Sequence, residues 1–129
     1  MMQDLEVAPT RSTPAIRFSA ETGRLEISGE SYPENSFAFF EPVMSWVVAF
    51  LAKTDVPIRF DLHVSYMNTS SIKALVDMLD LLEQAHVAGR DVAVTWSYDE
   101  ENDRALDMAE EFKDDLTLPF TMVARQATD

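Results

Sequence analysis

Hydrophobic and polar residues alternate in five short segments of the chain, which is the pattern of strands that are buried on one face only. The segments are residues 15–18, 24–28, 58–65, 91–98 and 120–124. A short turn that contains Gly23 separates the first two, so they predict a β-hairpin in which Gly23 supplies a positive φ. In each segment the apolar residues share one parity, as Phe60, Leu62 and Val64 do.

Three other segments repeat their apolar residues at helical spacing. They cover residues 36–52, 70–88 and 101–113. Pro42 lies inside the first, which predicts either a helix start nearer Glu41 or a bend at the proline. Gly89 follows the second and predicts a left-handed C-terminal stop. The predicted order of elements along the chain is therefore ββαβαβαβ.

The strand pattern decides the predicted architecture. Strands covered by helices on both faces should be apolar throughout, whereas each of these strands has one apolar face and one polar face. We therefore predict a two-layer α/β fold, with a mixed five-stranded sheet, three helices on one face and right-handed crossovers. Residues 1–13 lack periodicity and are expected to form a flexible lead-in, while residues 14–129 are expected to form a single domain.

Asn68, Thr69, Ser70 and Ser71 stand between the third predicted strand and the second predicted helix. A helix N-terminus offers free backbone N–H groups and the positive end of the helix dipole, so a phosphate on one of these hydroxyls is tolerated there. Its addition changes the local charge by about 1.5 to 2 units. Asn, Ser and Thr are also the ordinary N-cap residues, so a cluster that only caps the helix is the alternative.

Composition narrows the classes of function. The chain has 129 residues, 47% of them hydrophobic, which suits one folded domain. A formal charge of −13 disfavours nucleic acid and anionic membranes as partners. The sequence has no cysteine, nothing that resembles a signal peptide and no run of about 20 apolar residues. We therefore predict a cytoplasmic location.

No arrangement of residues in the sequence predicts an enzyme. With only three glycines the chain has neither a P-loop nor a dinucleotide-binding fingerprint, and no nucleophile elbow surrounds Ser70 or Ser71. His63 and His86 have no metal-ligand spacing. The acidic residues at 99–103 suit a helix start better than a calcium loop. The sequence thus predicts no catalytic residue, no metal and no cofactor.

The second predicted helix has two apolar stripes. The stripe that we expect to face the sheet consists of Ile72, Leu75, Val76, Leu79 and Leu82. The other consists of Ala74, Met78, Leu81 and Ala85. Neighbouring helices can cover this second stripe, or it can form an exposed groove for a partner that starts at the hydroxyl cluster. The width of an apolar face does not distinguish the two.

Several segments resemble the signature segments of the SiaC family of regulatory phosphoproteins. They are STPAI (residues 12–16), GESYPENS (29–36), YMNTSSIK (66–73), WSYD (96–99), EFKDD (111–115) and LPF (118–120). The likeness extends over nearly the whole chain, and its two longest motifs are specific. The succession of strand, Asn, hydroxyls and helix is also similar to the phosphorylated corner of STAS-like anti-sigma-factor antagonists, which agrees with the predicted two-layer fold.

The resemblance implies a partner-switching module without enzymatic activity. In the family, a dedicated kinase phosphorylates the threonine of the Asn-Thr-Ser-Ser motif, which is Thr69 here. A metal-dependent protein phosphatase removes the phosphate. The unmodified form binds and activates a diguanylate cyclase, which raises cyclic di-GMP and favours aggregation or biofilm.

Two sets of residues follow as candidates for the switch. Those around the phosphosite are Asn68, Ser70, Ser71 and Lys73, and Lys73 is spaced to pair with a phosphate on Thr69. Those expected to contact the partner are Ser31, Tyr32, Glu34, Asn35, Ala74, Met78 and Leu81. A phosphate resists desolvation against a partner far more than a hydroxyl does. The alternative is a constitutive protein-binding module in which residues 68–71 only cap the helix.

Overall fold

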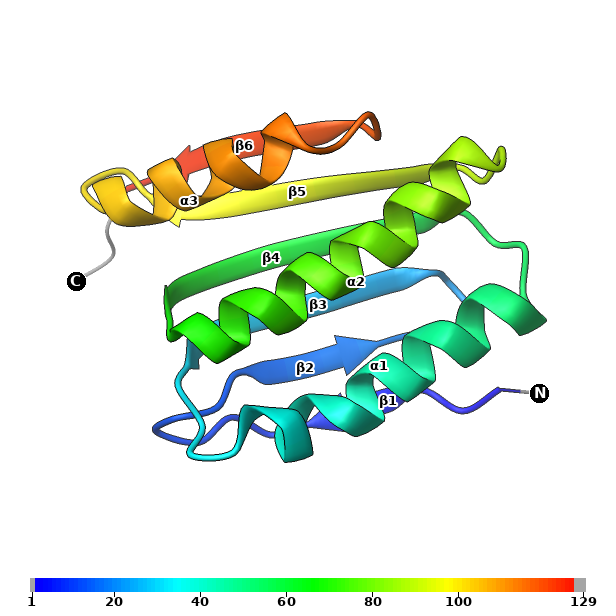
Figure 1. Ribbon diagram of the computed structural model, residues 1–129, viewed down its shortest axis with the longest axis horizontal. Helices are drawn as coiled ribbons and strands as arrows, with labels where there is room; N and C mark the ends of the chain where they lie inside the picture. The colour runs from blue at the N-terminus through cyan, green and yellow to red at the C-terminus, as the bar shows by residue number, and fades with distance from the viewer. Residues whose placement is uncertain (1, 127–129) are drawn as a thin grey trace.

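Six strands form one mixed sheet in the computed structural model, which describes residues 2–126 (Figure 1). The strands are β1 (Leu5–Val7), β2 (Ala15–Phe18), β3 (Arg24–Ser31), β4 (Ile58–Met67), β5 (Val92–Asp99) and β6 (Phe120–Arg125). Their order across the sheet is their order along the chain. The pairs β1–β2 and β2–β3 are antiparallel, and the pairs from β3 to β6 are parallel.

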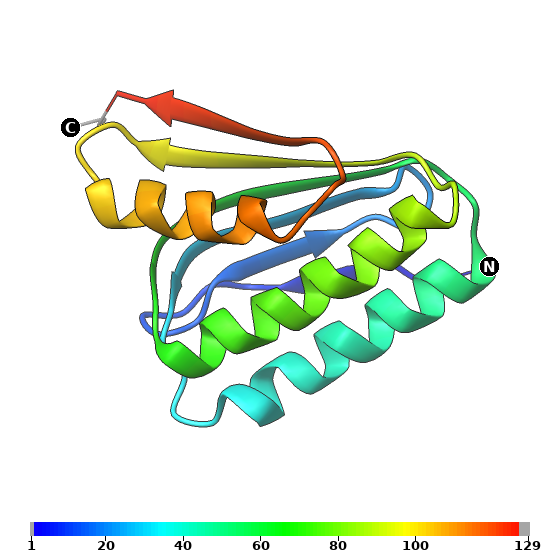
Figure 2. The same cartoon turned by 45° about the horizontal axis from the view of Figure 1, so that its top comes forward.

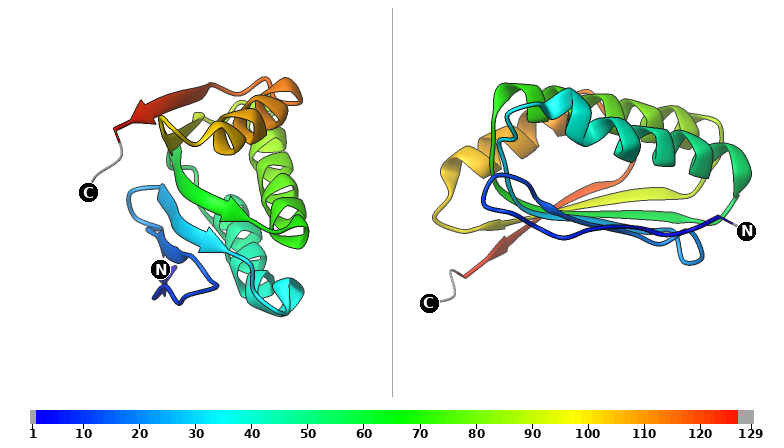
Figure 3. Two further views of the ribbon diagram at one scale, coloured as in Figure 1. Left: turned by 90° about the vertical axis from the view of Figure 1, so that its left-hand side faces the viewer. Right: turned by 90° about the horizontal axis from the view of Figure 1, so that it is seen from below.

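Three helices join the parallel strands and cover one face of the sheet. They are α1 (Ser36–Lys53), α2 (Thr69–Val87) and α3 (Asp103–Asp114). Each crossover is right-handed, and because the strand order runs in one direction, all three helices lie on the same side (Figure 3, right). The predicted two-layer α/β class is confirmed, with six strands in place of the expected five. Residues 127–129 of the predicted domain lie outside the described part of the chain.

The additional strand is β1, which lies in the segment expected to be a flexible lead-in. Leu5 of β1 pairs with Phe18 of β2 in antiparallel register. The indole Nε1 of Trp46 in α1 donates a hydrogen bond to Gln3 O at 2.8 Å, which ties the same segment to the helical layer. Three alternating residues are too few to show a period in the sequence. This strand therefore depends on partners that lie far from it along the chain.

The core lies between the sheet and the helices, and its members follow from the strand parity. Phe60 of β4 and Trp96 of β5 are fully buried, and Trp96 packs edge-on against Phe112 of α3 with ring centroids 5.7 Å apart. Trp46 and Phe50 of α1 stack with a centroid distance of 4.9 Å. The helical spacing of the first and third helices predicts one apolar face each, and these residues are confirmed as buried or half-buried: Phe40, Val43, Met44, Val47, Phe50 and Leu51 in α1, and Ala105, Met108, Ala109 and Phe112 in α3.

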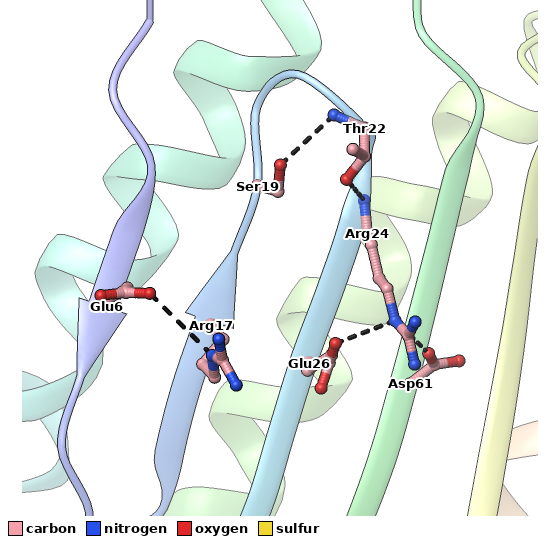
Figure 4. Close-up of polar contacts among 7 residues, drawn as sticks. All are labelled: Glu6, Arg17, Ser19, Thr22, Arg24, Glu26 and Asp61. Carbon is pink, nitrogen blue, oxygen red and sulfur yellow. Dashed lines mark hydrogen bonds and ion pairs between the residues drawn. The ribbon is translucent and has the colours of Figure 1, made fainter.

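No helix of the described chain covers the opposite face of the sheet, which carries exposed ion pairs (Figure 4). Arg24 Nε of β3 lies 2.8 Å from a carboxylate oxygen of Glu26 and 3.1 Å from one of Asp61 in β4. Arg17 and Glu6 link β2 to β1 at 3.9 Å. Exposed pairs of this kind contribute little to stability. Because these charged side chains are exposed, this face of the sheet is in contact with water, as the strand pattern predicts.

Asparagines cap the three helices. The side-chain oxygens of Asn35, Asn68 and Asn102 each accept a hydrogen bond from a backbone N–H three residues later. Each bond satisfies one of the donors that a helix leaves free at its N-terminus. Gly89, with φ at 108°, follows the end of α2 as predicted.

α1 begins at Ser36, well before Pro42, so the alternative start near Glu41 is wrong. With 18 residues and a mean hydropathy of 1.3, α1 matches a membrane span by length and composition, a test that the core helix of a globular protein also meets. One side of α1 packs on the sheet through Val47 and Phe50, yet only 28% of its residues are buried. The apolar character of α1 therefore extends to its outward side.

Glu83 of α2 fixes the segment that leads into β6. Its Oε1 accepts hydrogen bonds from Thr117 N at 2.9 Å and from Leu118 N at 3.0 Å, and its Oε2 accepts one from the Thr117 hydroxyl. The bond from the Thr117 hydroxyl is the main reason why the pKa of Glu83 lies below its ordinary value of 4.5, and the two backbone N–H groups act in the same direction. The carboxylate form of Glu83 therefore stabilises this connection.

We expect Glu83→Gln to lower the free energy of unfolding by about 0.5–1 kcal/mol at neutral pH, because a neutral amide oxygen accepts these hydrogen bonds more weakly. A carboxylate with a depressed pKa stabilises the fold above its ordinary pKa and loses that contribution as the pH falls through the folded value. The difference from the wild type should therefore shrink below pH 4.5. Urea unfolding at neutral and acidic pH measures it, with the exposed Glu110→Gln as control. A difference that does not change with pH would contradict the assignment.

Candidate functional site

Four chain segments meet at one end of the molecule and form what we call the corner, defined as residues 31–36 and 66–73. β3 and β4 end there, and α1 and α2 begin there, side by side (Figure 2). The backbone N–H of Asn68 donates to Ser31 O at 2.9 Å, which continues the pairing of the two strands up to the start of α2. The corner thus brings together the two motifs that lie about a quarter of the chain apart in the sequence.

Asn68 alone provides the N-cap of α2. Its backbone is extended, with φ at −77° and ψ at 170°, and its Oδ1 accepts a hydrogen bond from Ser71 N at 2.9 Å. Its carbonyl accepts the bond from Ile72 N at 3.0 Å that begins the helix. The capping role proposed for the cluster therefore belongs to Asn68, and it needs none of the three hydroxyls that follow.

Two of the three hydroxyls join the segments of the corner. Ser71 and Ser31 form a hydroxyl pair at 2.7 Å, and both residues are buried, with exposed fractions of 0% and 1%. Ser70 and Ser36 form a second pair at 2.7 Å that connects the first turns of α2 and α1. Since buried hydroxyls without a partner are costly, the first pair holds the end of β3 against the start of α2.

Thr69 is the hydroxyl that has no structural task. It is the first residue of α2, its side chain is exposed, and its hydroxyl forms no hydrogen bond within residues 2–126. It lies at the positive end of the α2 dipole, beside N–H groups that have no acceptor inside the helix. This oxygen is therefore accessible without opening of the fold, and a negative charge placed there would meet favourable rather than repulsive backbone charge.

Lys73 extends from the next turn of α2 and pairs with Asp77. Its Nζ lies 3.4 Å from a carboxylate oxygen of Asp77, and both side chains are exposed. An exposed pair of this kind is worth little, so Lys73 can exchange Asp77 for a phosphate at small cost. Its predicted pairing with a phosphate on Thr69 stays a prediction.

The residues expected to contact a partner divide into exposed and buried ones. Tyr32 packs edge-on against Tyr66 with ring centroids 5.9 Å apart and is half-buried, whereas Glu34 and Asn35 are exposed. Ser31, which forms the buried hydroxyl pair described above, has an exposed fraction of only 1%, so it supports the corner from inside. Asn35 also caps α1, but the cap uses only its Oδ1, and the residue is exposed.

The second stripe of α2 is covered mostly by the neighbouring helix. Met78 is 1% exposed, and therefore belongs to the core and cannot serve as a contact residue in the folded chain. Ala74 and Leu81 are half-buried and pack against the core. Val76 was expected to face the sheet, but it is 37% exposed, so that assignment is wrong. The core side of α2 is thus turned toward α1 relative to the expectation.

A groove of about 620 Å³ runs between the outward sides of α1 and α2. Ser36 and Ser70 lie at its end in the corner, and Ala74 is in its wall. Most of the other lining residues belong to α1: Phe37, Phe40, Glu41, Met44, Ser45, Val48, Ala49 and Ala52. The contribution of α1 to this groove was not predicted from the sequence, although the shortage of charged residues in α1 could have indicated it.

The described residues contain no group of three or more His, Asp and Glu side chains that could hold a metal ion. His63 lies on the open face of the sheet, three residues before the corner along β4, with its Nε2 3.6 Å from Asp99. Thr69 and the other exposed side chains of the corner are accessible from solvent.

Comparison with known proteins connects the chain to one family. The family model described as SiaC family regulatory phosphoprotein matches residues 7–125. An uncharacterized protein of Pseudomonas aeruginosa strain UCBPP-PA14 is 50% identical over 123 residues, which are 95% of this chain and 98% of that protein. The crystal structure of apo-SiaC from Pseudomonas aeruginosa has a TM-score of 0.91 at 49% identity, over 95% of this chain and 100% of that one.

A further solved structure contains a relative together with a partner. It is the crystal structure of diguanylate cyclase SiaD in complex with its activator SiaC from Pseudomonas aeruginosa. The matching chain has a TM-score of 0.92 and is 49% identical, over 95% of this chain and 100% of that one. The similarity thus extends to a protein that binds and activates an enzyme.

The hydroxyl pair of Ser31 and Ser71 can be tested by a double-mutant cycle. Either Ser31→Ala or Ser71→Ala leaves one buried hydroxyl without a partner, so each should lower the free energy of unfolding by about 1–3 kcal/mol. The double variant should lose less unfolding free energy than the two single variants together, since it leaves neither hydroxyl without a partner. Urea unfolding of the four proteins gives the coupling energy, and Ser45→Ala on the exposed side of α1 serves as control. Additive effects would show that the two hydroxyls act independently.

Proposed function

The chain belongs to the SiaC family of regulatory phosphoproteins, and on that basis we propose that it is a non-enzymatic regulator switched by phosphorylation of Thr69. In this proposal the unmodified chain binds and activates a diguanylate cyclase, and the phosphorylated chain does not. A protein kinase adds the phosphate and a metal-dependent phosphatase removes it. The complex of the relative SiaC with diguanylate cyclase SiaD supports this choice of partner.

One observation carries the proposal for the switch. Of the three consecutive hydroxyls, Ser70 and Ser71 are engaged in the pairs that hold the corner, whereas Thr69 is exposed and unengaged within residues 2–126. If the cluster served only as a cap, Asn68 would be sufficient, because it already makes the capping bond. Thr69 is thus the residue that can change chemically without changing the fold.

The effect of the phosphate on binding follows from its charge. A hydroxyl can be covered by a partner at modest cost, whereas a phosphate brings about 1.5 to 2 negative charges that must be desolvated or matched by cations. The chain already has a net charge of −13, so a partner that docks at the corner meets added repulsion if it is also acidic. The phosphorylated form should therefore lose affinity mainly through charge.

The proposed contact surface borders Thr69. It includes Tyr32, Glu34 and Asn35 on one side of the corner and Ala74 and Leu81 on α2, all of which are at least partly exposed. Through the activity of the cyclase, the unmodified chain would raise cyclic di-GMP and favour aggregation or biofilm. A cytoplasmic location is part of this proposal.

The alternative function is a constitutive binding module that uses the open face of the sheet. That face carries charged side chains such as Arg24 and Asp61, which can contact a partner whatever the state of Thr69 (Figure 4). The intact mass of the protein isolated from its own cells separates the two, because phosphorylation adds about 80 Da. An added phosphate on a residue other than Thr69, or none under any growth condition, would favour the alternative.

We expect Thr69→Asp to weaken binding to the cyclase by at least about tenfold, while Thr69→Ala binds like the wild type, because only the first places a charge at the corner. Calorimetric titration of the cyclase with each variant measures the affinities, and cyclic di-GMP production measures activation. Thr121→Asp, an exposed threonine of β6 on the open face, is the matched control. Equal affinities of Thr69→Asp and Thr69→Ala would contradict the switch.

A further inference from the structure

We infer that the outer edge of β6 is a second docking site, which binds an extended basic segment of another protein as an added strand. This edge lies two strands away from β4 and the corner. The inference goes beyond the proposed function and does not depend on the state of Thr69. It is carried by the backbone of residues 120–124 and by the charge of α3 beside them.

β6 is the last strand of the sheet, and every second residue of it directs its backbone away from β5. Pro119 O accepts a hydrogen bond from Val94 N at 2.9 Å, and Arg125 O accepts one from Glu100 N at 2.8 Å. In a parallel pair, alternate residues of a strand bond to the neighbour, so the odd-numbered residues of β6 face β5. The other residues have no strand beside them within residues 2–126, and their N–H and C=O groups point outward: Phe120, Met122 and Ala124.

The edge at β6 lacks the features that usually protect an exposed sheet edge, which are shortness, charge and proline. β1, at the other edge, has only three residues, contains Glu6 and is followed by Pro9. β6 has six residues, and none of residues 120–124 is charged. An edge of this kind is suited to recognise an extended peptide through main-chain hydrogen bonds.

α3 determines the charge next to this edge. It packs on β5 and β6 from the helical side of the sheet (Figure 1). Residues 99–115, which include α3 and the turns around it, contain nine acidic and two basic residues, so they hold −7 of the total charge of −13. A strand added to β6 places every second side chain on the same side as α3. Lys or Arg at these positions would be attracted to the carboxylates.

The remaining side chains of the added strand would lie on the open face of the sheet, beside Thr121, Val123 and Arg125. Val123 is 37% exposed and offers apolar contact, whereas Arg125 repels a cation. Apolar and β-branched side chains suit these positions. The partner segment should therefore alternate basic residues with residues such as Val or Thr.

A second copy of this chain fits the edge poorly. Antiparallel pairing of β6 with β6 of another copy would bring the two α3 helices to the same face of the joined sheet. Each brings the charge of −7 of residues 99–115, so the two copies repel each other where they would have to meet. Charge complementarity thus favours a basic segment of a different protein.

Amide hydrogen exchange tests the site on the wild-type chain. The probe is an acetylated and amidated peptide that alternates Lys and Val over about eight residues, slightly longer than β6. At saturation it should slow exchange of the Met122 and Ala124 amides by at least about tenfold, with little change at Thr121 and Val123, which already bond to β5. NMR measures each amide separately. Binding of the peptide without protection of Met122 and Ala124, or no binding at all, would overturn the inference.

A proline variant tests the same edge by affinity. Ala124→Pro removes an outward N–H and leaves the bonds to β5, since proline is tolerated where the N–H of an edge strand faces solvent. It should weaken peptide binding by at least about tenfold in a fluorescence anisotropy titration, whereas the control Ala124→Ser keeps the N–H and should bind like the wild type. Equal affinities of the two folded variants would contradict strand addition. Should Ala124→Pro fail to fold, the exchange pattern of the wild type decides.

Two further peptides separate strand addition from attraction by charge. A peptide that alternates Glu and Val should bind at least about tenfold more weakly, because it meets the acidic α3. A peptide that alternates Lys and Pro has the same charge as the probe but lacks half of its N–H donors, and it should leave Met122 and Ala124 unprotected. Equal protection by the Lys-Pro peptide would overturn strand addition, and equal affinity of the Glu-Val peptide would overturn the basic occupant.

Two other results concern the occupant and the independence of the site. Protection of Met122 and Ala124 that rises with the concentration of the chain alone would overturn the inference, because it assigns the edge to a second copy. Thr69→Asp should bind the Lys-Val peptide like the wild type, and a weaker affinity would contradict a site that is independent of the corner. A chain that binds the peptide but no cyclase would contradict the proposed function and leave this site standing.

Discussion

The corner depends on the way in which α2 begins directly at the end of β4. A helix that starts at a sheet edge exposes free N–H groups next to a buried core, and these need acceptors. Asn68 caps the helix, Ser71 pairs with Ser31 of β3 in the interior, and Ser70 pairs with Ser36 of α1. Because these three residues fix two strands and two helices at once, Thr69 between them has no structural role left, and its side chain points to solvent.

Most of the layer architecture could be predicted from the sequence because each strand is wet on one side. That pattern places all the helices on one face, and with a right-handed crossover it also gives the strand order. β1 could not be predicted, because three residues have no period and Leu5–Val7 is held by β2 and by the contact of Trp46 with Gln3. Pro42 was misleading as a sign of the helix start. A proline cannot donate a backbone hydrogen bond inside a helix, yet α1 begins earlier, where the side chain of Asn35 caps it.

The residue types of the candidate site could be predicted from the sequence, but the separate role of each hydroxyl could not. The sequence places three hydroxyls in a row, and only the fold shows that Ser71 is buried while Thr69 is exposed. The side of α2 that faces the core was not predictable either. Two apolar stripes overlap on this helix, and the position of α1 decides which of them is covered. Met78 is therefore core and Val76 is half-exposed, the reverse of what the helix alone suggests.

A rigid corner determines what kind of switch phosphorylation can be. Many phosphorylation sites act by ordering or melting a segment, which needs a loosely held chain. Here the residues on both sides of Thr69 are held by hydrogen bonds to β3 and α1, so a phosphate on Thr69 would have little to rearrange. In the proposed switch, the phosphate would therefore act on the surface that a partner contacts, through charge and desolvation. Such a switch needs only a difference in partner affinity between the unmodified and the phosphorylated chain. A loss of about 1.4 kcal/mol in binding free energy already raises the dissociation constant tenfold.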